Sequence, residues 1–160
     1  MMPIGASNPV EITAAETYAL RQRVLRNNQA AAHLQWDGDN DPGTFHLGIR
    51  DGSGFIVAVS TWLSGPSATQ IRGMATDPAL IGGGLGSRLL TAGIERCRSS
   101  GSTVVWANAR VTAISFYERA GFTVVGAEFE TPDTGLPHKV VRLTLGRDVD
   151  RFPSVAPGTL

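Results

Sequence analysis

Residues 77–87 read DPALIGGGLGS, and this stretch decides the fold because it places four glycines between a predicted strand and a predicted helix. Residues 69–76 before it are typical of a strand, and residues 85–99 after it carry a broad apolar face that suits a helix packed on a sheet. Residues without side chains let consecutive backbone N–H groups surround an anion, and the first turn of the helix adds its own unbonded N–H groups. The stretch therefore predicts an anion-binding turn at a sheet edge.

Other interpretations of this turn are weaker. A flexible loop has no need to lead directly into a well-patterned helix. A Walker-type nucleotide loop requires Gly-Lys-Ser/Thr, whereas residues 86–88 read Gly-Ser-Arg. A Rossmann dinucleotide turn shares Gly82 and Gly84, but five residues separate the strand from the glycines, and Asn108 rather than an acid ends the next strand. A dinucleotide-binding module stays as a rival hypothesis.

Patterns outside the turn predict one mixed α/β domain. A capping box, Thr13 with Glu16, begins a helix whose apolar stripe leaves Arg21 facing elsewhere. The polar segment 35–43 (QWDGDNDPG) predicts a surface loop. Further strands are predicted at 44–50, 55–63, 102–108, 122–130 and 138–145, with a short helix at 112–120. We expect a mixed central β-sheet of six to seven strands with helices on both faces, a single domain over residues 1–146 and a flexible C-terminal tail at 147–160.

Composition narrows the function classes. The chain has 160 residues, 19 of them glycine, and 14 Lys+Arg balance 14 Asp+Glu. This balance argues against a non-specific nucleic-acid binder or an anionic-membrane binder. No apolar run approaches the length of a membrane span, and no secretory signal is visible. Cys97 is the single cysteine and the three histidines are far apart, so we expect no disulfide, no metal site and a buried, inert thiol. We expect a cytoplasmic protein, and a homodimer is left open.

Four motifs in order along the chain resemble one enzyme family. They are RGMATDP at 72–78, the glycine turn at 82–87, Asn108, and FYERAGF at 116–122. Together they resemble the GNAT superfamily of acetyl-CoA-dependent N-acyltransferases. The resemblance implies a GNAT-like fold and direct transfer of acetyl from acetyl-CoA to a small-molecule or peptide amine, through a ternary complex without an acyl-enzyme.

The same resemblance implies a set of cofactor-binding residues. The glycine turn would bind the pyrophosphate of coenzyme A, but Ile81 stands where the family has Arg or Gln, and Gly83 stands at a usually polar position. The strand before the turn would bind the pantetheine arm through a bulge, and an amide near Met74 would donate to the thioester oxygen. Asn108 either bonds pantetheine or caps its loop, and Ser115 is a weaker contact. The full predicted set is Met74, Ala75, Thr76, Ile81, Gly82, Gly83, Gly84, Leu85, Gly86, Ser87, Asn108, Ser115 and Tyr117.

The catalytic and acceptor residues are less specified by the motifs. The resemblance implies that Tyr117 is the general acid that protonates the departing thiolate. The family has no fixed base, so His46, Glu130, Glu128 and His138 are candidates, with Glu128 and His138 preferred. Arg72 either pairs with a carboxylate or, with His138, faces the acceptor.

Two alternatives stay open about the partners of this chain. Asp37, Asp39 and Asp41 either form a solvated loop or favour a cationic acceptor. The main rival function is a non-catalytic acyl-CoA-sensing or partner-binding module of the same fold.

Overall fold

The helix after the glycine-rich turn forms as its apolar pattern predicts. In the computed structural model, which describes residues 8–26, 34–132 and 134–146, helix α2 spans Leu85–Ser99. Its buried side chains are Leu85, Leu89, Leu90, Ile94 and Cys97. Burying one leucine or isoleucine contributes about 1.5–3 kcal/mol. This face therefore fixes the helix, and with it the glycine turn at its N-terminus, on the sheet.

The strands of the described residues form one seven-stranded sheet in the order β1-β2-β3-β4-β5-β7-β6. The strands are β1 (Val10–Ile12), β2 (Phe45–Arg50), β3 (Ile56–Ser64), β4 (Ala68–Thr76), β5 (Val104–Arg110), β6 (Thr123–Glu130) and β7 (Pro137–Thr144). Only β4 and β5 pair in parallel, and every other neighbouring pair is antiparallel. The prediction of a mixed six- to seven-stranded sheet is thus confirmed.

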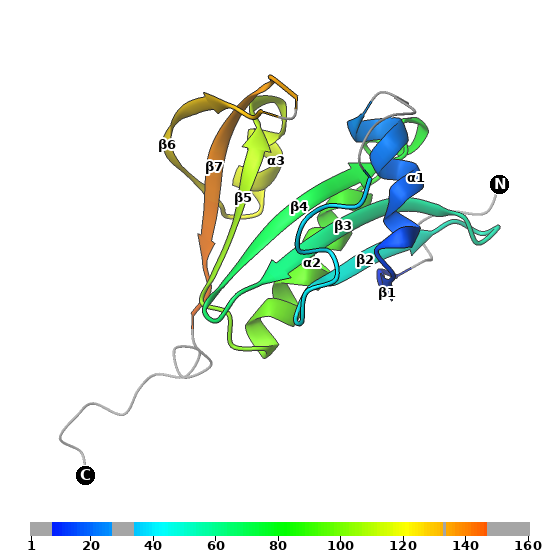
Figure 1. Ribbon diagram of the computed structural model, residues 1–160, viewed down its shortest axis with the longest axis horizontal. Coiled ribbons are helices and arrows are strands. Elements are labelled where there is room, and N and C mark those ends of the chain that lie inside the picture. The colour runs from blue at the N-terminus through cyan, green and yellow to red at the C-terminus, as the bar shows by residue number, and fades with distance from the viewer. Residues whose placement is uncertain (1–7, 27–33, 133, 147–160) are drawn as a thin grey trace, which may run out of the picture.

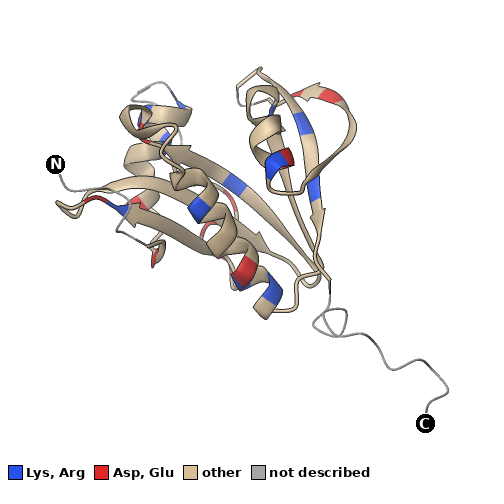
Figure 2. Cartoon of the chain, turned by 180° about the vertical axis from the view of Figure 1, so that it is seen from behind, with Lys and Arg blue, Asp and Glu red and all other residues tan. Residues whose placement is uncertain are grey.

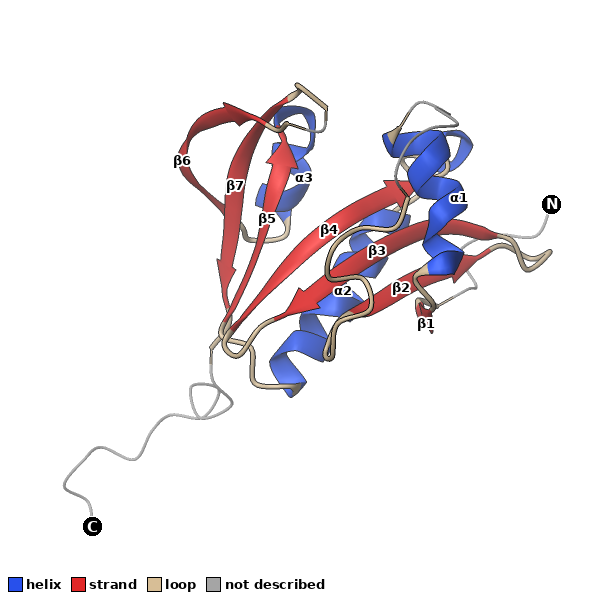
Figure 3. Cartoon of the chain, in the orientation of Figure 1, coloured by secondary structure: helices blue, strands red, loops and turns tan. Residues whose placement is uncertain are grey.

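Helices cover both faces of this sheet (Figures 1 and 3). One face carries α2 and, after the 3-10 turn η5 (Val111–Ala113), helix α3 (Ile114–Arg119), and both pack into the main core. The other face carries a helical segment made of η2 (Ala15–Thr17), α1 (Tyr18–Leu20) and the π-helical η3 (Arg21–Leu25). Its Leu20 packs with Ile12, Val59 and Ala75 in a second cluster.

The first helical segment begins at the predicted capping box. The backbone N–H of Thr13 donates to Glu16 Oε1 at 3.0 Å, and the N–H of Glu16 donates to Thr13 Oγ1 at 3.3 Å. These two bonds satisfy N–H groups that a helix start otherwise leaves without partners. The predicted end of this helix at 27–28 and the predicted tail at 147–160 lie outside the described residues.

Close packing between α2 and β3 depends on a glycine in the helix. Trp62 of β3 is fully buried and stacks on Phe45 with ring centroids 5.7 Å apart. A Cβ atom placed on Gly93 would lie 1.8 Å from Cζ2 of Trp62. Any larger side chain at position 93 would therefore force the helix and the tryptophan apart.

Charge is distributed over the molecule without a dominant sign. Basic and acidic residues both occur on α2, as Figure 2 shows from behind. Within the described residues, every helix is too short or too polar to cross a lipid bilayer.

Candidate active site between β4 and β5

The parallel pairing of β4 and β5 ends halfway along the two strands. Residues Ala68–Ile71 pair with Val104–Ala107, and beyond them the strands diverge (Figure 1). The later part of β4 therefore presents a strand edge that β5 does not occupy. An extended ligand can hydrogen-bond to such an edge as an additional strand would.

A β-bulge lies at the point of divergence. Arg72 pairs with Thr61 and Ala75 pairs with Val59, so β4 has one more residue than β3 between these two pairs. Gly73 lies inside the bulge with φ of 60°, in the left-handed region that favours glycine. A Cβ atom at this position would also lie 2.6 Å from Cζ3 of Trp36. Backbone geometry and the neighbouring ring both require glycine here.

The glycine turn has the geometry of an open anion cradle. Gly82 and Gly84 have φ of 93° and 81°, and a Cβ atom on either would meet no heavy atom within 4 Å. Gly84 is the N-cap of α2, and no side chain caps that helix end. The first-turn N–H groups of α2 are thus available to a ligand. Donors of this kind can bind an anion such as a diphosphate, and Ile81, which is 72 % exposed, adds no polar side chain.

A pocket of about 940 Å³ joins the glycine turn to the diverging strands. The predicted residues that line it are Arg72, Met74, Ala75, Thr76, Ile81, Gly82, Gly84, Leu85, Gly86, Ser87, Asn108, Tyr117 and His138. Gly83, Ser115 and Glu128 are not among the described residues that line it. The structure therefore brings most of the predicted set to one cavity and leaves these three outside it.

Tyr117 is held in this pocket by aromatic neighbours. Its ring packs edge-on against Phe116 and Phe122, with centroids 5.1 and 5.3 Å away. The side chain is buried, and burial raises the pKa of Tyr117 to about 12. Within the described residues its hydroxyl has no hydrogen-bond partner. The phenol therefore stays protonated at neutral pH and can donate to a ligand atom.

His138 lines the same pocket with one ring nitrogen already engaged. Its Nδ1 lies 2.7 Å from the carbonyl oxygen of Leu136. A carbonyl can only accept, so Nδ1 carries the proton, and Nε2 of the neutral ring is the basic nitrogen. The other candidate bases lie elsewhere: Glu128 and Glu130 are exposed on β6, and His46 is buried outside the pocket.

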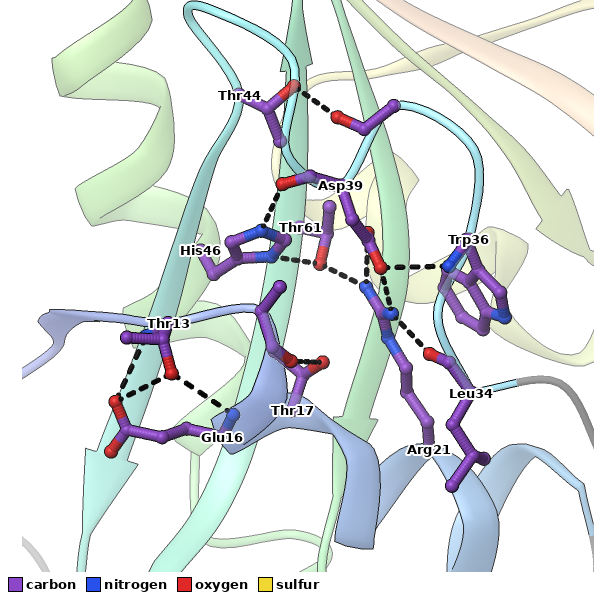
Figure 4. Close-up of polar contacts among 12 residues, drawn as sticks. Thr13, Glu16, Thr17, Arg21, Leu34, Trp36, Asp39, Thr44, His46 and Thr61 are labelled. Atoms are coloured by element: carbon purple, nitrogen blue, oxygen red, sulfur yellow. Dashed lines mark hydrogen bonds and ion pairs between the residues drawn. The ribbon is translucent and has the colours of Figure 1, made fainter.

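Asp39 corrects the prediction of a solvated loop at 35–43. Its carboxylate accepts from Nη1 and Nη2 of Arg21 at 2.7 and 2.9 Å, and the two side chains are 1 % and 0 % exposed (Figure 4). Burial alone would raise the pKa of Asp39, but the hydrogen bonds from Arg21 and from the N–H of Trp36 hold it below its ordinary value. Arg21, predicted to face away from the core, is thus buried because Asp39 pairs with it.

The same network holds His46 and Trp36 in place. Arg21 Nη2 also donates to Thr61 Oγ1 at 2.8 Å, and His46 contacts Thr61 through Nδ1 and the carbonyl oxygen of Asp39 through Nε2 (Figure 4). The Arg21 guanidinium carbon lies 3.8 Å from the Trp36 ring centroid. None of Asp37, Asp39 and Asp41 lines the pocket, so the acidic run does not favour a cationic acceptor there.

The structure shows no carboxylate partner for Arg72 among the described residues, and its predicted contact with the acceptor stays a prediction. Arg72 lines the pocket and, within the described residues, forms no ion pair.

The buried thiol of Cys97 lies in the α2 core, where burial raises its pKa, as expected of an inert cysteine.

Several residues that line the pocket were not predicted from the sequence, among them Gly73, Trp36 and Arg110. A glycine inside a strand pattern is a signal for a bulge. A tryptophan in a polar loop is a signal for a buried contact, because so large an apolar ring is costly to leave in water. No local signal marks Arg110, whose position depends on how β5 and η3 meet.

Sequence comparison relates this chain to a known enzyme family. The sequence profile of the acetyltransferase (GNAT) family matches residues 12–122. The chain is 33 % identical over 140 residues to YitI of Bacillus subtilis strain 168, described as an uncharacterized N-acetyltransferase, covering 84 % of this chain and 93 % of YitI.

Solved structures share the fold at lower sequence identity. An acyl-CoA N-acyltransferase from Pseudomonas aeruginosa has a TM-score of 0.72 at 20 % identity, over 86 % of this chain and 99 % of its own. An aminoglycoside 6'-N-acetyltransferase complexed with coenzyme A has a TM-score of 0.72 at 12 % identity, over 87 % of this chain and 98 % of its own.

Proposed function

The chain belongs to the acetyltransferase (GNAT) family, and on that premise we propose that it transfers an acetyl group from acetyl-CoA directly to an amine. The observation that carries the proposal is the continuity of one pocket. It runs from the glycine turn, along the free edge of β4, to the side chain of Tyr117. An acyl-CoA ligand is long, anionic at one end and reactive at the other, which matches this sequence of features.

We assign the two ends of the pocket to the two ends of the cosubstrate. The N–H groups of Gly82 and of Gly84–Ser87 at the start of α2 would bind the diphosphate. The unpaired edge of β4 at Met74–Thr76 would bind the pantetheine amides, with Asn108 on the opposite strand. When bound, acetyl-CoA supplies the activated acetyl thioester. A backbone N–H near Met74 would donate to the thioester oxygen, where negative charge develops as the amine attacks.

Tyr117 acts in this proposal as the proton donor to the leaving sulfur. A phenol with a pKa of about 12 is a weaker acid than an exposed phenol of about 10. Burial also disfavours the charged thiolate of the leaving group. The pKa of the coenzyme A thiol therefore rises in the pocket together with the pKa of Tyr117. The proton therefore moves to sulfur as the carbon–sulfur bond breaks, without free thiolate forming in an apolar environment.

His138 acts as the base that takes the proton from the attacking amine. The Leu136 carbonyl orients its ring and leaves Nε2 as the acceptor. A His138→Gln variant should lose activity most strongly near neutral pH and recover part of it in alkaline solution, where the amine is already neutral. An unchanged pH–rate profile would remove His138 from this role.

The proposal is tested by calorimetry with acetyl-CoA and by thiol release with a broad panel of amines. Tyr117→Phe should lower kcat by roughly 10²- to 10⁴-fold while the Kd for acetyl-CoA changes little. Tyr18, the only other tyrosine, lies outside the pocket, so Tyr18→Phe is the matched control. Equal losses of binding and turnover in Tyr117→Phe would make the residue structural. Binding without turnover in the wild type would favour the non-catalytic acyl-CoA-sensing module.

A further inference from the structure

The pocket wall is basic. Four arginines line it, Arg26, Arg72, Arg110 and Arg119, and none of the described lining residues is Asp or Glu. Asp133, the one acid in the turn between β6 and β7, lies outside the described residues. A site that selects a polycationic acceptor needs carboxylates to complement it. This lining is complementary to negative charge.

Three of the arginines meet at one corner of the pocket. The guanidinium carbons of Arg26 and Arg72 lie 5.3 and 5.0 Å from the centroid of the Trp36 ring. Arg26 and Arg110 both donate to the carbonyl oxygen of Leu25, at 3.1 and 3.4 Å. Because these contacts are shared, the three side chains form one cationic corner, defined here as Arg26, Arg72 and Arg110.

Among the residues that the structure describes, two members of the cationic corner have no carboxylate partner. Neither Arg72 nor Arg110 forms an ion pair within the described residues, whereas Arg21, Arg23 and Arg50 each do. Burial and, to a smaller extent, the charge of Arg26 lower the pKa of Arg110. A half-buried cation beside another cation is costly unless an anion joins it. Arg72 and Arg110 are therefore the two cations of the corner considered below as partners of a ligand anion.

The cationic corner lies at the acceptor end of the pocket rather than at the phosphate end. Arg72 precedes the end of β4 by four residues, which is roughly 13 Å at the usual rise of a strand, and the glycine turn follows that end. Arg110 pairs in register with His138 across β5 and β7, so the two side chains share one face of the sheet. The corner thus adjoins the proposed base.

We propose that the acceptor is a small amine that also carries a carboxylate, as an amino acid does, and that Arg72 and Arg110 bind this carboxylate. This inference rests on the proposed acetyltransferase function and names its acceptor class. Guanidinium groups bind carboxylates through paired N–H donors, which fixes the orientation of the acceptor. The amine nitrogen then bonds to the acetyl carbon, the carbon–sulfur bond breaks, Tyr117 protonates sulfur, and His138 takes the amine proton. The carboxylate itself is unchanged.

The first test compares matched amines on the wild-type protein. Each set contains an amino acid, its methyl ester and the corresponding amine without the carboxyl group, and spermidine serves as a polycation. The amine of the ester is less basic than that of the amino acid, and the decarboxylated amine is more basic. A preference over both therefore cannot come from basicity. We expect kcat/KM for the best amino acid to exceed both partners by about tenfold to a hundredfold.

The second test removes the two cations one at a time. Arg72→Gln and Arg110→Gln should each lower kcat/KM for the carboxylate-bearing amine by about tenfold or more, with little change for the decarboxylated amine. The Kd for acetyl-CoA should stay the same, which separates acceptor binding from cosubstrate binding. Arg142, exposed on β7 and absent from the described pocket lining, gives the matched control Arg142→Gln.

The outcomes separate this inference from the function on which it rests. Acetylation of amines without a preference for the carboxylate, or with a preference for spermidine, overturns the inference and leaves the proposed function standing. Equal losses in Arg72→Gln toward both amine classes overturn it as well. A wild-type protein that binds no acetyl-CoA overturns both proposals.

Discussion

Replacing Asp39 with asparagine tests whether the buried ion pair behind Trp36 stabilises the pocket wall. The carboxylate accepts two bonds from Arg21, at 2.7 and 2.9 Å, and a third from the N–H of Trp36 at 2.9 Å. Asparagine keeps the shape but leaves the guanidinium buried without a counter-charge. Such a loss costs about 3–5 kcal/mol. For a chain of this size, this lowers Tm by roughly 6–20 °C.

The assay is urea and thermal denaturation followed by circular dichroism, at neutral and at acidic pH. The lowered pKa of Asp39 means that its charge stabilises the folded state above the ordinary carboxyl pKa of about 3.9. That stabilisation is lost as the pH falls through the lowered value. The difference between wild type and Asp39→Asn should therefore shrink in acid. Asp41→Asn, in the same loop but exposed, should change stability by no more than about 0.5 kcal/mol.

A double-mutant cycle decides whether the two charges act together. In an Arg21→Met background, Asp39→Asn should cost at least about 2 kcal/mol less than it does in the wild type. Costs that add within about 0.5 kcal/mol would show that the two charges act independently. A loss below about 1 kcal/mol for Asp39→Asn alone would show that the pair does not stabilise the fold, because removing one charge of a desolvated pair costs more than this.

Substitutions of two glycines and one tyrosine test the packing and the pocket. Gly73→Ala should weaken acetyl-CoA binding by about tenfold or more. The reason is that φ at this position is 60° and the alanine Cβ would lie 2.6 Å from Trp36 Cζ3. An unchanged Kd in calorimetry would contradict this expectation. Gly93→Ala should lower the free energy of unfolding by about 1–3 kcal/mol, although alanine has the higher helix propensity. The alanine Cβ would lie 1.8 Å from Trp62. A higher Tm would show instead that the helix can shift. The raised pKa of Tyr117, about 12, keeps the buried phenol neutral while the unfolded phenol ionises. Stability should therefore fall by up to about 3 kcal/mol between pH 10 and 12, and Tyr117→Phe should lack this component in alkaline denaturation curves.

Local patterns were sufficient to predict most of the fold. The helix predicted at 85–99 is α2, because apolar spacing and the glycine N-cap both act within a few residues. The hairpin of β2 and β3 follows from alternating β-forming residues around Asp51–Gly54, whose turn closes with the N–H of Gly54 on the carbonyl oxygen of Asp51 at 3.0 Å. Such signals need no knowledge of distant partners.

The candidate site was only partly predictable because some of its contacts join distant residues. An arginine on an amphipathic helix indicates a solvated face unless its partner is known, and Arg21 finds Asp39 and Thr61 across separations of 18 and 40 residues. Burial of Asp39 depends on the same pair, so neither residue reveals it alone. Arg110 reaches the cationic corner through a carbonyl on η3, which no pattern within β5 anticipates.

The early separation of β4 from β5 ties folding to ligand binding. Four residue pairs join the two strands. Hydroxyl contacts hold the closed end of the gap between the strands, here called the vertex. There Thr69 Oγ1 lies 3.0 Å from Ser102 Oγ, and Thr103 Oγ1 donates to the Ser67 carbonyl oxygen at 3.0 Å. This vertex sets how wide the strands open. A ligand that bonds to both edges completes the hydrogen-bond ladder that the chain leaves unfinished. Changes at the vertex, far from any reacting atom, would then alter cosubstrate affinity by altering the angle of the sheet.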